Sequence, residues 1–220
     1  MADYFPEEMQ YYPYNRVQAY GTLPNIEMIP YMIRNYLMDM PSAGYVPPDN
    51  NASYRCCLMK YLYHDCANPL SQPLPTPEQK LALVYDPDKP GTPPIDKGYR
   101  IFTQQLVSQA QTLGVSTLRI YMGRVTPISP YSAHISVVID CLTNNDYESN
   151  TRGTDLSRTY AMACMCERAL SGVDMGAGVG AFIFDRREHN DCSIVMISDE
   201  SVNIGYRLTM GMTVIGENER

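Results

Sequence analysis

The chain has 220 residues, of which 45% are apolar, and it carries a formal net charge of −7 at pH 7. This length suffices for one sizeable hydrophobic core, and the acidic balance argues against direct binding to nucleic acid or to an anionic membrane, because both favour a basic surface. No apolar run is long enough to span a bilayer, and acidic residues stand where a secretory signal would be basic, so we expect a cytoplasmic protein.

The N-terminal segment, residues 1–24, is rich in tyrosine and is broken by Pro6 and Pro13. Its tyrosines are Tyr4, Tyr11, Tyr12, Tyr14 and Tyr20. Tyrosine combines a large rigid ring with a polar tip and has few rotamers to lose, which suits it to interfaces. The sequence therefore predicts an arm over 1–24 that makes self-assembly contacts, followed by a single domain over 25–220.

Apolar periodicity in the domain predicts about three helices. The first covers 30–40 and has Pro30 in its first turn, where no hydrogen-bond donor is needed. The second begins at Asp96 and ends at Gly114.

The third predicted helix is capped by Thr154 or Asp155 and ends at Gly172. Its middle, YAMACMC, is apolar almost all round, which predicts a buried helix.

Strand patterns occupy much of the remaining chain. They cover 53–64, 80–85, 116–125, 133–143, 180–186, 192–198 and 203–215. The last three are expected to form an antiparallel meander. Clusters of strands separated by occasional helices predict an α+β fold with a mostly antiparallel β-sheet or sandwich.

The cysteines indicate free thiols and no metal site. They are Cys56, Cys57, Cys66, Cys141, Cys164, Cys166 and Cys192. Their number is odd and several lie in apolar runs, which favours a reducing compartment. None of them has the C-x₂₋₄-C pairing of a zinc site, and Cys164 and Cys166 fall on different faces of their helix.

Two short motifs are candidates for catalytic or binding sites. The stretch AHISV resembles half of the site of two-histidine phosphoesterases, with His134 and Ser136 as its polar residues, but His64 and His189 lack a matching Ser or Thr. A hydrogen-bonded histidine on a strand is the alternative. The glycine run 176–181 follows a helix and opens a strand, which is the reverse of a phosphate-binding loop, and so indicates tight turning or close backbone packing.

The balance of basic residues suggests extensive interfaces. The chain has thirteen Arg and only four Lys, together with eighteen Tyr. Arginine and tyrosine are enriched at protein interfaces and lysine is depleted there. We therefore expect much of the surface to contact other molecules.

This composition, together with SAHISVVIDCLTNNDYESNTRGTDLSRTYAMACMCERA (132–169), resembles the cypovirus polyhedrins, which crystallise around virus particles in infected cells. The resemblance implies a β-sandwich with helices, a projecting N-terminal helix and trimers packed into a lattice. It also implies that the chain binds copies of itself and virus particles, that no cofactor is required, and that nucleotides can be bound.

The sequence thus favours a self-assembling viral structural protein, and not an enzyme, that forms a crystalline occlusion body. Such a body would be stable at neutral pH and dissolve in alkali, because tyrosine ionises near pH ~10. The alternatives are an intracellular enzyme or small-molecule binder around His134 and Ser136, or an unrelated viral structural or host-interaction protein.

Overall fold

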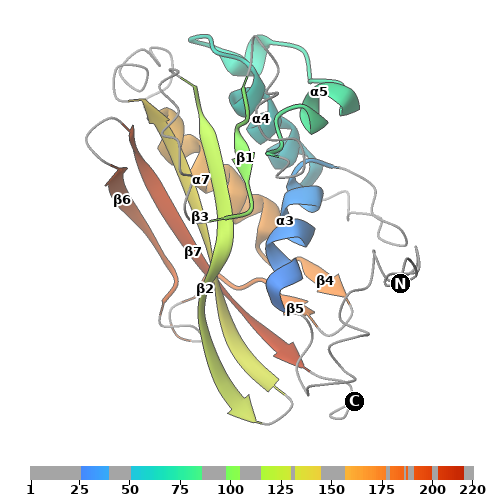
Figure 1. The fold of residues 1–220 in the computed structure, drawn as a ribbon, viewed down its shortest axis with the longest axis vertical. Coiled ribbons are helices and arrows are strands. Elements are labelled where there is room, and N and C mark those ends of the chain that lie inside the picture. Colours follow the sequence, from blue (N-terminus) through green and yellow to red (C-terminus); the bar gives the residue numbers. More distant parts are fainter. Residues whose placement is uncertain are drawn as a thin grey trace, which may run out of the picture.

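The computed structural model has an α+β fold, as the sequence predicts, in which helices pack on one face of a β-sheet (Figure 1). It describes residues 26–39, 51–85, 98–104, 115–129, 132–144, 157–176, 179–185, 187, 191–199 and 203–215. The helices within these residues are α3 (Ile29–Leu37), α4 (Ala52–Tyr63), α5 (Pro77–Leu81) and α7 (Arg158–Leu170). The strands are β1 (Ile101–Phe102), β2 (Thr117–Ser129), β3 (Ser132–Asn144), β4 (Asp174–Gly176), β5 (Val179–Ala181), β6 (Ser193–Asp199) and β7 (Asn203–Ile215).

The described strands all belong to one sheet. Its order is β1-β2-β3-β7-β5-β4, and β6 lies beside β7. Only β1 and β2 are parallel; the other pairings are antiparallel. The two-sheet sandwich that the sequence left open, and that the polyhedrin resemblance implies, is not formed by these residues.

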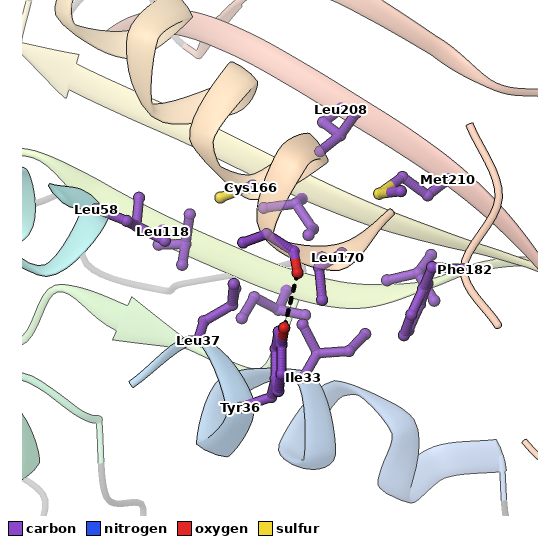
Figure 2. Close-up of a cluster of buried hydrophobic side chains, with 14 of the residues drawn as sticks. Ile33, Tyr36, Leu37, Leu58, Leu118, Cys166, Leu170, Phe182, Leu208 and Met210 are labelled. Carbon is purple, nitrogen blue, oxygen red and sulfur yellow. Dashed lines mark hydrogen bonds between the residues drawn. The ribbon is translucent and has the colours of Figure 1, made fainter. Parts of the chain in front are cut away.

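The core lies between the helices and the side of the sheet that faces them (Figure 2). Alternation along β3 directs Ile135, Val137 and Ile139 into this core. The Tyr36 hydroxyl of α3 donates to the carbonyl oxygen of Ala169 in α7 at 2.9 Å. This bond ties two helices together within the same layer.

α3 and α7 confirm the first and third predicted helices, but the predicted cap of α7 is wrong. The Ser157 hydroxyl accepts a hydrogen bond from the backbone N–H of Tyr160 at 3.2 Å, so Ser157 is the cap. Thr154 and Asp155 precede it and lie outside the described residues. Because all three residue types favour the cap position, the sequence did not distinguish them.

The segment 53–64, predicted as a strand, lies almost wholly in α4. Its buried residues Arg55, Leu58, Met59 and Leu62 follow the i, i+3, i+4, i+7 spacing of a helix. An arginine at the first of these positions interrupted the apolar stripe, and the aromatic content of the segment suggested a strand instead.

Two further predictions fail near the beginning of the sheet. The segment 80–85 was expected to be a strand, but it includes the end of α5, and only Val84 bridges to Ile101. Within the second predicted helix, Ile101 and Phe102 form the strand β1 instead, while Asp96 and residues 105–114 lie outside the described part.

Buried arginines hold the C-terminal end of α4, where backbone carbonyls lack helical partners. Arg158 donates from Nη2 to the carbonyl oxygen of His64 at 2.6 Å. Arg100 donates to the carbonyl oxygen of Leu62 at 2.7 Å and forms a forked pair with Asp65, both bonds 2.6 Å long. These contacts fix α4 against α7 and the sheet.

This use of arginine corrects the composition argument. Arg55, Arg100 and Arg158 are buried, and so are Tyr36 and Tyr61. For these five residues the inference that arginine and tyrosine mark interface surface is wrong, because the fold itself uses them.

Candidate functional site

The strand β6 forms an outer edge of the sheet. It pairs along its whole length with β7, and none of the described residues pairs with its other side. Figure 1 shows it as the outermost strand beside β7. Val195 and Met196, in its middle, are 50% and 63% exposed. The edge therefore presents unpaired backbone groups together with apolar side chains.

Within the described residues, β6 up to Ser198 carries none of four features that usually protect an exposed strand. Such features are lysine, proline, bulges and inward-pointing charges. Residues 193–198 are all apolar or hydroxyl-bearing, Asp199 is the only acidic residue of the strand, and the register with β7 is unbroken. Ile194, Val195 and Ile197 are β-branched and favour extended backbone. The strand is chemically suited to accept another strand.

A row of larger side chains extends this edge onto the side that carries the helices. Met196 stands opposite Tyr206 of β7, and the rings of Tyr206 and Tyr160 of α7 lie 5.1 Å apart. A hydrogen bond with the Cys164 thiol raises the pKa of Tyr160. The row Met196–Tyr206–Tyr160 therefore joins the exposed edge to the helical layer.

The outer half of β2 is the contrasting edge. Beyond the two residues that pair with β1, no described residue pairs with its outer side. Arg124 and Pro127 are exposed there, and the pairing with β3 shifts register between Met122 and Val125 and again between Pro127 and Ser129. The sequence predicted this strand over 116–125, but it continues to Ser129.

Ser136 has a structural role at this edge. Its hydroxyl accepts a hydrogen bond from the Arg124 N–H at 2.6 Å and donates to the Arg124 carbonyl oxygen at 3.4 Å. A Cβ at Gly123 would lie 2.6 Å from the Ser136 Oγ, so the register shift requires a glycine there. Ser136 thereby fixes the irregular part of β2.

His134 and His64 do not form a two-histidine site. His134 shares the face of β3 with Ser136, and its Nδ1 lies 3.1 Å from the Thr213 hydroxyl. His64 ends α4 in the helical layer on the other face of the sheet, where its Nε2 bonds to the Pro73 carbonyl oxygen. These two histidines therefore do not converge, and His189 lies outside the described residues.

A polar cluster ties the middle strands together on the face of the sheet away from the helices. Asp140 of β3 accepts from the Tyr121 hydroxyl of β2 at 3.0 Å and from Arg207 of β7 at 2.7 and 2.9 Å. The pKa of Tyr121 is raised well above its usual range by burial and by the Asp140 carboxylate. The hydrogen bond to Asp140 raises the pKa of Arg207.

The cysteines are free thiols, as the sequence predicts. Cys166 is buried against the sheet beside Cys141, whose pKa is raised by a hydrogen bond with Cys166 and by burial, while Cys164 is only half-buried. This confirms that Cys164 and Cys166 occupy different faces of α7. The residues that the structure describes contain no group of three His, Cys, Asp or Glu side chains that could hold a metal ion.

The glycine run 176–181 takes part in the β4–β5 pairing. A Cβ at Gly180 would lie 2.6 Å from the carbonyl oxygen of Thr213 in β7. Close backbone packing, the interpretation preferred from the sequence, is confirmed.

The assembly residues predicted from the sequence fall on the arm. Tyr4, Tyr11, Tyr12, Tyr14 and Tyr20 lie outside the described residues, so their role stays a prediction. Sequence reasoning found β6 as a strand but missed its outer edge as a site. The sequence feature that could have indicated this edge is the uncharged, proline-free run CSIVMIS.

No family model, curated protein or solved structure matches the chain. Among the helices that the structure describes, none has the length and apolar character needed to cross a membrane.

Proposed function

We propose that this chain is a structural protein that assembles with copies of itself, and that the outer edge of β6 is one assembly surface. The observation that carries the proposal is the unprotected edge, with Val195 and Met196 exposed at its centre. A strand of this kind gains backbone hydrogen bonds when another strand is added to it.

A second copy of the chain is the partner that this edge fits best. The chain carries a net charge of −7, so two copies repel at long range and need an uncharged contact. Residues 193–198 provide one, because they contain no ionisable side chain. The same sheet places Arg124 and Pro127 on the exposed half of β2, and its terminal strands β1 and β4 have only two and three residues, which indicates that the openness of β6 is a local property.

The resemblance to polyhedrins extends this proposal to a viral occlusion body that is stable at neutral pH and dissolves in alkali. The arm over 1–24 would then supply a contact besides β6. The tyrosine-rich composition of the arm suits it to an interface, and the position of β6 at an edge of the sheet suits it to strand pairing. Neither role requires a chemical reaction.

The test replaces Val195 with lysine. Val195 is half exposed, so Val195→Lys should leave the fold intact while placing a charge in the centre of the contact. We expect association to weaken roughly 100-fold, since a misplaced charge at an interface costs several kcal/mol. Light scattering after size-exclusion chromatography at neutral pH would measure it.

The matched control is Leu81→Lys, at a residue that is 54% exposed. Leu81 belongs to α5, which lies on the opposite side of the fold from β6 (Figure 1). This variant should assemble like the unmodified chain. Equal association by Val195→Lys, or a monomeric unmodified chain at high protein concentration, would contradict the proposal.

A further inference from the structure

We propose that two copies pair antiparallel through β6 about a twofold axis that passes beside Met196, perpendicular to the sheet. This inference rests on the proposed function and names its partner geometry. It predicts one continuous sheet across two chains.

The symmetry follows from the geometry of strand pairing. A twofold axis perpendicular to the sheet reverses the strand direction but keeps each face on its own side. Both helical layers then lie on the same side of the joined sheet, and every residue stands opposite one that points to the same face. Because an isologous contact uses the same patch twice, one open edge per chain is enough.

The register centred on Met196 gives every residue of the seven-residue strand a partner. Val195 comes opposite the partner's Ile197, and Met196 comes opposite the partner's Met196. Cross-strand pairs of β-branched residues stabilise a sheet, and methionine adapts to irregular contacts. The one acidic residue, Asp199, comes opposite the partner's Ser193, whereas registers centred nearer the end of the strand bring like charges together.

The side chains on the helical side strengthen this choice. Met196 continues into Tyr206 and Tyr160, whose rings lie 5.1 Å apart. The twofold axis brings the same row from the partner to meet it above β6. Backbone hydrogen bonds are thereby joined by burial of an apolar strip that one chain alone leaves exposed, since Met196 is 63% exposed.

Among the described strands β6 is the only edge of this kind, since β4 has three residues and the outer half of β2 is irregular, so the pairing closes on itself. A lattice then needs at least one other contact, and the tyrosine-rich arm over 1–24 is the segment that the sequence predicts for it. Loss of the arm should leave a dimer, whereas Val195→Lys should remove the dimer itself.

Cysteine cross-linking in the full-length chain tests the register. The variants are Val195→Cys, Ile197→Cys and Met196→Cys. Each is oxidised with a copper(II) complex; two copper(II) ions take one electron each and become copper(I) as two thiols form a disulfide and release two protons. Mass spectrometry of the peptides that contain β6 separates these disulfides from any involving the native cysteines, and the unmodified chain is oxidised in parallel.

We expect Met196→Cys to cross-link to its own copy, or an equimolar mixture of Val195→Cys and Ile197→Cys to form the mixed 195–197 disulfide. One of these two pairs belongs to the closely spaced, non-hydrogen-bonded kind. The mixed disulfide should exceed either same-residue disulfide roughly tenfold, because diagonal neighbours are too far apart to bond.

Other outcomes separate the two proposals. Disulfides of Val195→Cys and of Ile197→Cys each with its own copy would indicate parallel pairing and overturn the inference. Assembly without any cross-link at these three positions would overturn it as well, while leaving self-assembly standing. A chain that stays monomeric by light scattering would overturn both.

Discussion

The outer half of β2 and the outer edge of β6 border the same sheet, yet they differ in how well they are protected against pairing with another strand. β2 carries Arg124, Pro127 and two register shifts, whereas the residues of β6 before Asp199 are uncharged and keep an unbroken register with β7. Ser136 holds the irregular part of β2 with two hydrogen bonds to Arg124. No comparable device is found along β6 in the described residues.

The difference teaches that edge protection in this fold is built locally, strand by strand. A proline removes a backbone donor and a bulge turns the remaining donors away from a straight partner. Since β2 has both and β6 has neither, β6 is the one of these two edges that can accept a regular strand. The difference between the two edges therefore supports β6 as the proposed assembly surface more strongly than the composition of the whole chain does.

The largest expected effect comes from removing the protection of β2. The double variant Arg124→Thr with Pro127→Val restores a backbone donor and removes a charge at that edge. The register shifts of β2 remain in this variant, so we expect open chains of copies beside the closed dimers, joined through the part of β2 beyond Val125. Dynamic light scattering would detect the increase in size. Arg168→Thr, on the exposed face of α7, controls for the lost charge, and an unchanged size distribution of the double variant would refute the edge argument.

Asp140→Asn tests whether the middle of the sheet acts independently of its edges. Asp140 is 3% exposed and Arg207 is 38% exposed, so solvent weakens the pair that the substitution breaks. We expect a loss of about 2 kcal/mol in the free energy of unfolding, below the range for fully buried pairs. Urea denaturation measures it, with the exposed Asp191→Asn as the control. Self-association measured under native conditions should not change. If association weakens together with stability, the edges of the sheet depend on this polar cluster.

The smallest expected effect is that of Tyr121→Phe, which removes one hydrogen bond to Asp140 and should cost about 1 kcal/mol at neutral pH. Because the pKa of Tyr121 is raised in the folded state, its contribution to stability is complete below pH ~10 and is lost as pH rises through the raised pKa. The variant should therefore lose less stability in alkali than the unmodified chain does.

This pH dependence also sharpens the contrast between sheet and assembly. Unfolding followed by circular dichroism, and dissociation followed by turbidity, should separate in alkali if phenols outside the sheet drive dissociation near pH ~10. Tyr31→Phe, at an exposed tyrosine of α3, serves as the control. Coincident curves that both shift in Tyr121→Phe would show that alkali acts by unfolding the sheet.

Local sequence determined much of the secondary structure. The strands β2, β3, β6 and β7 follow from apolar and β-branched patterns, and α3 and α7 from helical spacing, although the cap of α7 was assigned to the wrong residue. The helix α4 was missed because Arg55 stands among its buried residues. Burial of that arginine is supported by Asp39, whose carboxylate lies 3.1 Å away, and by the Tyr36 ring, 4.5 Å away. Tyr36 lies in α3 and Asp39 in the turn that follows it, so no pattern local to α4 indicates the burial.

The candidate site divides in the same way between sequence and tertiary structure. The run CSIVMIS by itself predicts an uncharged strand, and its lack of proline and lysine can be read directly. Whether such a strand lies inside a sheet or at its edge depends on which strands flank it, and those partners are distant in the sequence for most of this sheet. Here β3 occupies one side of β7 along its full length, so β6 takes the other side and keeps its own outer edge unpaired among the described residues. Strand order, which hydrogen bonding and packing of the whole sheet decide together, turned an ordinary strand pattern into an exposed surface.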